Sequence, residues 1–143
     1  MRDFQKNRVY SWEREYLSHK DHSHVPFDQV KAIVNYVWSG EGLEYPPLVE
    51  LLDPRDKTAL ARANRQKVWV KPEGLPTWVV LHELSHTLTC DIDGGSNLHG
   101  PRFVGIYMKL LEKYLGIPLS YLMFTATKAG VKFDITAKTY LRD

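Results

Sequence analysis

The stretch His82–Phe103, HELSHTLTCDIDGGSNLHGPRF, constrains the fold of this 143-residue chain more than any other. His82 and His86 stand four residues apart in a segment whose apolar residues recur with helical spacing, so both side chains project from one side of a helix. A third histidine, His99, follows a glycine-rich loop at the start of a second apolar segment with the same period. The three imidazoles can meet only if the second helix folds back across the first.

Three histidines in this arrangement are suited to hold one zinc ion. Zinc takes neutral imidazole nitrogens at about 2.0–2.1 Å, and a catalytic zinc site has three protein ligands and one open position. His82 and His86 supply two ligands, and we expect His99 to supply the third. The residues that compete with His99 are Asp91 and Asp93 in the loop and Glu112 on the following helix. Glu112 is the second choice, because a downstream helical glutamate is a third ligand in some HExxH enzymes.

Glu83 follows the first histidine directly and points about 100° away from it around the helix. A glutamate at this position of an HExxH helix acts as a base on the attacking water and does not bind the metal. We therefore expect Glu83 to transfer the proton in a hydrolytic reaction. A structural metal that only joins two helices needs no such base, so Glu83 favours a catalytic site.

The composition fits a single globular domain over residues 1–143. Hydrophobic residues make up 43% of the chain and charged residues 25%, and a net charge of +2 is too small to indicate a nucleic-acid or membrane-surface protein. Cys90 is the only cysteine, which excludes an intrachain disulfide and a cysteine-based zinc ribbon; we expect a buried, inert thiol. The N-terminus has no apolar signal segment and no long apolar run follows, so we expect a cytoplasmic protein with no membrane partner.

The pattern of apolar residues predicts an α+β fold. Helices are expected over residues 27–38, 77–90, 101–115 and 118–129. Strands are expected over residues 48–52, 58–63 and 67–71, forming a small antiparallel sheet packed against the helix that carries the HExxH motif. Residues 2–17 mix aromatic and β-branched residues with charges, which predicts a strand and then a helical turn, and the last residues predict a polar tail.

Two segments within residues 78–103, VVLHELSHTL and LHGPRF, resemble the active-site region of the SprT-like zinc metallopeptidases. Over its whole length the chain is similar to a family of small metallohydrolases from actinobacteria and their phages, which share the opening pattern formed here by Arg2, Asp3, Gln5, Arg8, Val9, Tyr10 and Glu13. The resemblance implies a zincin-like domain in a bacterial or phage-infected cell, with His82, His86 and His99 as zinc ligands and Glu83 as base. SprT-like proteins often add a zinc ribbon or other DNA-binding segments, which this chain lacks, so the resemblance does not extend to DNA-linked proteolysis.

These features together predict a zinc-dependent hydrolase, most directly a peptidase that acts on a peptide or protein substrate. Zinc polarises the substrate carbonyl, and Glu83 takes a proton from water and returns it to the leaving amine. The oxyanion that develops needs a further donor, for which the following helix offers Tyr107, Arg102 and Tyr114. Tyrosines at helical spacing are, however, more often core residues.

Two other functions are compatible with the sequence. The same fold can be a non-catalytic binding module with a structural zinc. It can also associate with nucleic acid through a group of basic residues on the predicted strand pair, which are Arg55, Lys57, Arg62, Arg65, Lys67 and Lys71. A solvated basic edge that discourages strand-to-strand aggregation explains the same residues without a ligand, and we favour that interpretation.

A second group of histidines precedes the first predicted helix. His19, His22 and His24 form an HxxHxH pattern, which either holds a second metal or belongs to a polar loop. The segment is polar throughout and shows no periodic pattern of apolar residues, so we favour a polar loop over a second metal site.

Overall fold

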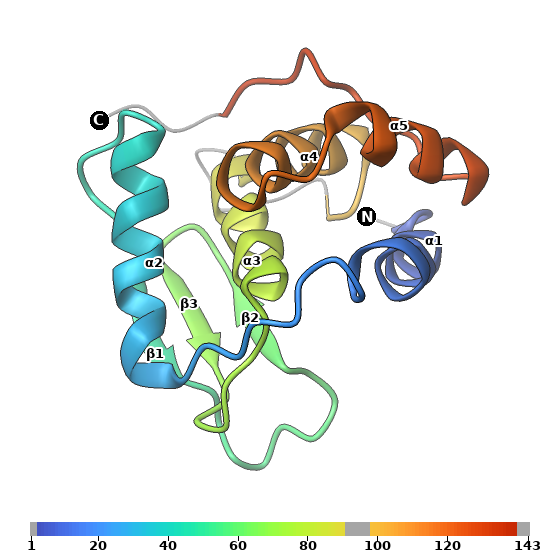
Figure 1. Cartoon of the computed structure of the whole chain (residues 1–143). Helices are drawn as coiled ribbons and strands as arrows, with labels where there is room; N and C mark the ends of the chain where they lie inside the picture. Colours follow the sequence, from blue (N-terminus) through green and yellow to red (C-terminus); the bar gives the residue numbers. More distant parts are fainter. Residues whose placement is uncertain (1–2, 91–97, 140–143) are drawn as a thin grey trace.

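A computed structural model describes residues 3–90 and 98–139 of the chain. This part is α+β, with five α-helices, one short π-helical segment and a three-stranded sheet. Helix α3 (Thr77–Thr89) lies at the centre, with the sheet against one side, α4 (Pro101–Leu115) against another, and α2 (Phe27–Gly40) beside it (Figure 1). The buried apolar side chains form one cluster that includes the apolar residues of α3. The helix with the HExxH motif is therefore enclosed on several sides.

The sheet contains β1 (Leu48–Leu51), β2 (Ala61–Ala63) and β3 (Lys67–Val70), in the order β1-β3-β2. β3 pairs antiparallel with β2 but parallel with β1, so the prediction of an antiparallel sheet is wrong for one of the two strand pairs. The cause is the loop over residues 52–60, which places β2 one strand position away from β1 and leaves a gap between them. The chain reverses direction between β1 and β2 and again between β2 and β3, so β3 fills the gap parallel to β1 and antiparallel to β2.

The burial of the strands agrees with this order. The central strand β3 buries Val68 and Val70 completely, whereas the edge strand β1 exposes Leu48 and Leu51. Sequence alone did not predict which strand is central, because all three predicted strands contain apolar residues.

The hairpin between β2 and β3 is fixed to α3 by Asn64. The Asn64 side chain accepts hydrogen bonds from the backbone N–H groups of Gln66 and Lys67, each at 2.8 Å, which stabilises the turn. The backbone carbonyl of Asn64 accepts a hydrogen bond from the Thr87 hydroxyl at 2.8 Å. Edge strand β2 is thereby held beside the helix that carries His82 and His86.

The start of α3 is capped from a distant loop. Pro76 is the N-cap residue and makes no side-chain cap, which leaves the first N–H groups of the helix without local acceptors. The Ser23 hydroxyl accepts from the N–H of Thr77, and the Asp21 carboxylate accepts from that of Trp78, both at 2.9 Å. The polar segment before α2 therefore stabilises the N-terminus of α3.

Helix α4 begins at Pro101, because the fixed backbone angle of proline suits the first helical turn. It is followed by Gly116, whose φ of 67° is left-handed and ends the helix.

After α5 (Leu119–Lys128) the chain crosses α4 at Gly105, where a Cβ atom would collide with the carbonyl of Asp134. Val131 and Ala137 are buried along this crossing, so the prediction of a polar tail is wrong at these two positions.

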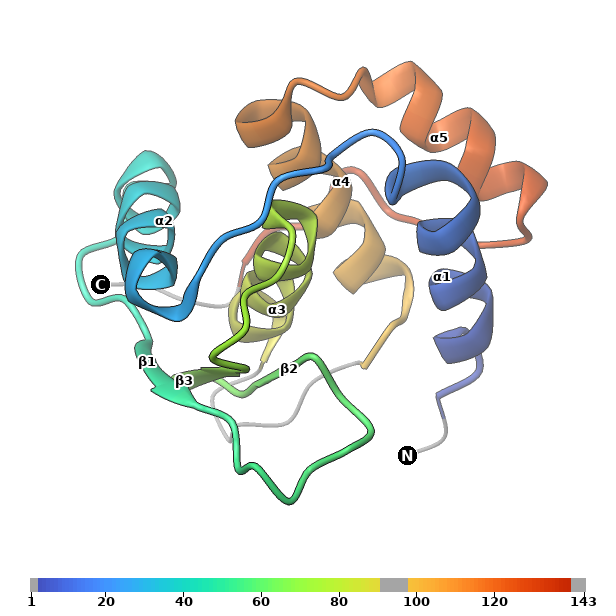
Figure 2. The same cartoon turned by 60° about the horizontal axis from the view of Figure 1, so that its bottom comes forward.

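The N-terminal segment is helical from Lys6 to Leu17, so the prediction of a strand there is wrong. Helix α1 (Lys6–Trp12) continues directly into the π-helical segment η1 (Glu13–Leu17). Val9, Trp12 and Leu17 are completely buried, and the Trp12 indole N–H donates to the Thr125 hydroxyl of α5 at 2.9 Å. Figure 2 shows α1 packed against α5. The β-branched and aromatic residues of this segment favour a strand, but the packing against α5 outweighs that preference and makes the segment helical.

The other predicted helices agree with the structure to within two residues at each end. Among the described residues, none of the helices has both the length and the apolar character needed to cross a membrane.

Candidate metal centre

His82, His86 and His99 come together beside α3. One ring nitrogen of each lies within 4.8 Å of those of the other two, and this is the one group of potential metal ligands of that size found among residues 3–90 and 98–139. His82 and His99 are each 6% exposed, and His86 is partly exposed. His99 directly precedes the N-cap of α4 and follows Leu98, whose φ of 61° is left-handed and turns the chain back toward α3.

Two carboxylates from the N-terminal segment orient two of these histidines. The Nδ1 atom of His82 lies 2.5 Å from the carboxylate of Glu13, and the Nδ1 atom of His99 lies 2.7 Å from that of Asp3. A carboxylate can only accept, so both Nδ1 atoms carry a proton. The Nε2 atoms are thereby left to face the space between the rings, as in metal sites where a carboxylate fixes the histidine tautomer.

The two Nε2 atoms are 3.3 Å apart, which fits a shared metal ion. Two nitrogens at about 2.0–2.1 Å from a tetrahedral zinc ion lie about 3.3 Å from each other. Two neutral imidazoles at this distance would place their lone pairs face to face, so the pair needs one cation, a proton or a metal, between its nitrogens. The donor set and its spacing therefore fit a zinc-type ion.

Aromatic rings enclose the three histidines. Phe103, in the first turn of α4, packs on all of them, with ring centroids 4.4 to 5.1 Å apart. Tyr10 from α1 lies over His82 and meets His99 edge-on, at 6.3 and 5.2 Å between centroids. These rings place apolar surface around the histidines, and electrostatic interactions are stronger in such surroundings than in water.

The protonation of the histidines follows from their surroundings. Burial lowers the pKa of His86 well below its ordinary value, and the neighbouring His82 and His99 lower it further. Burial also lowers the pKa of His99, against the opposing hydrogen bond to Asp3. Burial acts to lower the pKa of His82 as well, but the charge and hydrogen bond of Glu13 raise it overall. His86 and His99 are thus in the neutral form that binds metals, and at His82 a proton and a metal compete for Nε2.

Glu83 is a buried carboxylate, 7% exposed, to which no described residue donates a hydrogen bond. Burial raises its pKa, the charge of His82 lowers it, and that of Glu13 raises it further. Largely buried carboxylates whose pKa is shifted by their surroundings are concentrated at functional sites. The position next to the histidines is the one expected for the catalytic base.

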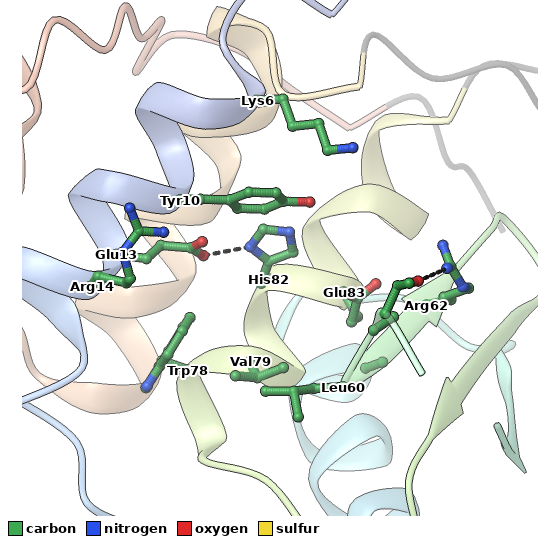
Figure 3. A pocket seen from close by; sticks show the side chains of 13 residues that line it. Lys6, Tyr10, Glu13, Arg14, Leu60, Arg62, Trp78, Val79, His82 and Glu83 are labelled. Atoms are coloured by element: carbon green, nitrogen blue, oxygen red, sulfur yellow. Dashed lines mark hydrogen bonds and ion pairs between the residues drawn. The ribbon is translucent and has the colours of Figure 1, made fainter. Parts of the chain in front are cut away.

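Two cavities of about 430 and 540 Å³ open beside the histidines, and both are lined by His82, Glu83 and Tyr10. Ala61 and Arg62 of β2 line the opposite wall of both. Figure 3 shows the first cavity, with Tyr10 over His82, Glu13 in contact with His82 from the left, and Glu83 on the side of Arg62. The histidines therefore lie at the bottom of a groove between α1 and β2.

The alternative third ligands are not in the cluster. Glu112 is exposed on α4, and its carboxylate accepts a hydrogen bond from the N–H of Leu119 at 3.3 Å. Asp91 and Asp93 lie outside the described residues.

The three candidate oxyanion donors on α4 have other contacts, and the core role favoured for Tyr107 is confirmed. Tyr107 is completely buried, and its hydroxyl donates to Glu13 at 2.9 Å. Tyr114 donates to Glu41 at 2.6 Å, and Arg102 lines neither of the two cavities. Tyr107 packs against His82 with ring centroids 5.4 Å apart, but Tyr10 is the tyrosine that lines both cavities. Burial raises the pKa of Tyr10, and the charges of Glu13, Glu83 and Asp3 raise it further, so Tyr10 keeps its proton and remains a donor.

The other sequence-based candidates are separate from this centre. His19, His22 and His24 are exposed and form no metal-type cluster within the described residues, while Asp21 and Ser23 of the same segment cap α3. Cys90 is buried at the end of α3, as expected.

The basic residues near the sheet are partly neutralised. Arg55 pairs with Asp53 at 2.8 Å, Arg62 with Asp56 at 2.5 Å, and Lys67 with Glu50 at 3.1 Å. These ion pairs weaken the basic surface that the nucleic-acid hypothesis requires.

Sequence reasoning missed the functions of Asp3, Tyr10 and Glu13. The strand prediction for the opening segment places Tyr10 and Glu13 on opposite faces, because they are an odd number of residues apart. In a helix the same spacing of three residues places both on one side, so a correct helix prediction is the signal that would have joined them. Asp3 precedes α1, and no local pattern indicates its contact with His99.

No protein-family model matches the chain, and neither the search of curated proteins nor the search of solved structures found a match.

Proposed function

We propose that this chain is a zinc-dependent hydrolase with a zincin-like fold, and most directly a metallopeptidase. The observation that carries the proposal is the combination of three converging histidines with a buried, unbonded glutamate directly beside them. A structural zinc site is closed by four protein ligands, whereas three ligands and an adjacent base are typical of hydrolytic sites. His82, His86 and His99 are the proposed zinc ligands.

The residues around the histidines have separate tasks in this proposal. A bound zinc ion supplies Lewis acidity toward a substrate carbonyl. Glu83 takes a proton from the attacking water and delivers it to the leaving amine. Tyr10 donates a hydrogen bond to the oxyanion from the α1 side of the groove. Glu13 and Asp3 hold His82 and His99 in the tautomer that binds metal.

Edge strand β2 favours a peptide as the substrate. β2 pairs with β3 on one side only, and its residues Ala61 and Arg62 line the groove on the other. An extended peptide can pair with the backbone of such an edge strand, which would bring its carbonyls past His82 and Glu83. Small side chains at Ala61 and Ala63 leave space for this approach.

Metal analysis by mass spectrometry tests the site. The purified wild type should hold about one zinc per chain, the Glu83→Gln variant should keep it, and the His99→Ala variant should lose it or bind it more weakly. A peptide library should then be cleaved by the wild type, while Glu83→Gln slows cleavage by about 100-fold or more, because proton transfer by a side chain contributes about that factor. Zinc content that does not respond to His99→Ala would contradict the ligand set.

A further inference from the structure

The groove beside the histidines has one wall formed by a single face of the N-terminal helical segment. Lys6, Tyr10 and Arg14 are spaced by four residues and all line the cavity of about 430 Å³. Residues at this spacing lie on one side of a helix. Figure 3 shows Lys6 and Arg14 on either side of Tyr10, with His82 below the tyrosine ring. A ligand in the groove therefore passes two cationic side chains, one on each side of the metal centre.

Lys6 and Arg14 are cations without an acidic partner among the described residues. Both are exposed, neither forms an ion pair with any of these residues, and Arg14 donates a hydrogen bond to the neutral Ser11 hydroxyl at 3.1 Å. The nearby carboxylate of Glu13 is already engaged by His82 and Tyr107. This differs from Arg62 on the opposite wall, whose charge is balanced by Asp56.

The spacing of the two cations corresponds to a short length of extended chain. Eight residues of helix rise by about 12 Å, which places Lys6 and Arg14 that far apart along α1 and η1. An extended peptide advances about 3.3 Å per residue, so it covers this distance in about four residues. Tyr10 lies midway, and the bond next to Glu83 would then have one cation about two residues away on each side.

We propose that the groove selects extended acidic peptides, with a carboxylate side chain about two residues on either side of the bond at the metal centre. Lys6 and Arg14 are the specificity-determining residues. This inference rests on the proposed function, because it takes the histidines and Glu83 as the reacting centre. Charge complementarity of this kind affects both the rate of association and the choice of partner.

Binding tests the inference without depending on turnover. The zinc-loaded Glu83→Gln variant is titrated into three fluorescent peptides with the same neutral three-residue core, flanked on both sides by Asp, Asn or Lys, and anisotropy is recorded. The Asp peptide should bind about tenfold more tightly than the Lys peptide, and the preference should weaken between low and high salt.

Charge reversal identifies the residues responsible. Lys6→Glu together with Arg14→Glu, in the Glu83→Gln background, should invert the order of the three peptides. The matched control reverses Lys31 and Lys138, which are exposed and line neither cavity, and should leave the order unchanged. Equal zinc content and equal melting temperature of the variants show that the site is intact.

The outcomes separate the inference from the proposed function. Equal binding of the three peptides, or an equal effect of the control variant, would overturn the acidic preference even if the wild type cleaves peptides. A clear acidic preference that Lys6 and Arg14 determine, combined with no cleavage by the zinc-loaded wild type, would support the preference and overturn the peptidase proposal. Absence of binding to any peptide would overturn both.

Discussion

Glu13 is a single carboxylate that serves two buried donors, the Nδ1 of His82 and the hydroxyl of Tyr107. It is 3% exposed, so these hydrogen bonds take the place of those that water makes to an exposed carboxylate. One of its partners is a proposed zinc ligand, and the other is a core residue of α4. The proposed metal centre and the packing of the core therefore depend on the same side chain.

Replacing Glu13 tests its effect on the metal. Glu13→Gln keeps the shape of the side chain but removes the charge that orients and polarises His82. We expect zinc affinity to fall by about 10- to 100-fold, as for other groups that hold a histidine ligand. Competition with a chromophoric chelator measures the affinity.

The matched control for Glu13 is Glu15→Gln. Glu15 belongs to the same segment η1 but is exposed, and it lines neither of the two cavities beside the histidines. Its replacement removes the same charge and should leave zinc affinity unchanged. Equal losses of affinity in the two variants would contradict the role of Glu13.

Tyr107 is expected to matter for stability and not for chemistry. Tyr107→Phe removes the hydroxyl that donates to Glu13, which leaves a buried carboxylate oxygen without that donor. The free energy of unfolding should fall by about 1 to 3 kcal/mol, measured by urea denaturation. The rate of peptide cleavage at saturating substrate should stay close to that of the wild type, whereas Tyr10→Phe should lower it. A large loss of rate in Tyr107→Phe with unchanged stability would reverse this assignment.

At the level of elements, α3 is positioned by contacts from three directions. The hairpin between β2 and β3 bonds to Thr87, α4 packs along the helix, and the loop before α2 caps its N-terminus. The cap comes from Asp21 and Ser23, which belong to the same polar segment as the three exposed histidines. That segment is therefore explained by helix capping.

Removal of the cap should destabilise the fold. Asp21→Ala deletes the acceptor for the N–H groups of Trp78 and Ser23, which Asp21 binds at 2.9 and 3.0 Å. The free energy of unfolding should fall by about 1 to 2 kcal/mol, the usual effect of losing a helix cap. His22→Ala, an exposed change in the same loop, is the control for urea denaturation and should have little effect. Equal effects of both substitutions would rule out the cap.

At the level of the whole molecule, the proposed metal centre joins segments that are far apart in sequence. Asp3 and Glu13 come from the N-terminal segment, His82 and His86 from α3, and His99 from the start of α4. A ligand that binds only this folded arrangement stabilises it by mass action. Metal binding and folding are therefore expected to be coupled in this chain.

This coupling predicts a large thermal shift. Free zinc at about a thousand times its dissociation constant should add about 4 kcal/mol to the free energy of unfolding. For a chain of this size that corresponds to a rise of about 10 °C in the melting temperature relative to the chelated protein. Calorimetry with zinc and with EDTA measures the shift, and His99→Ala should remove most of it. An equal shift in the variant would show that zinc binds elsewhere.

The sequence by itself determined the local features of this protein. The helices over residues 27–40, 77–89, 101–115 and 119–128 could be predicted because helical periodicity, prolines and glycines act within a few residues. The grouping of His82, His86 and His99 was predictable for the same reason, since two histidines share one helix and the third follows a short connection.

Only the tertiary structure decided the features that depend on distant contacts. The parallel pairing of β1 with β3 follows from the path of the loop between β1 and β2, which local patterns do not encode. The helical form of residues 6–17 follows from packing on α5, against the strand preference of its side chains. The contacts of Glu13 with His82 and of Asp3 with His99 join residues 69 and 96 positions apart. Such pairs form only after the chain has folded, because their energies come from burial and geometry that no short stretch contains.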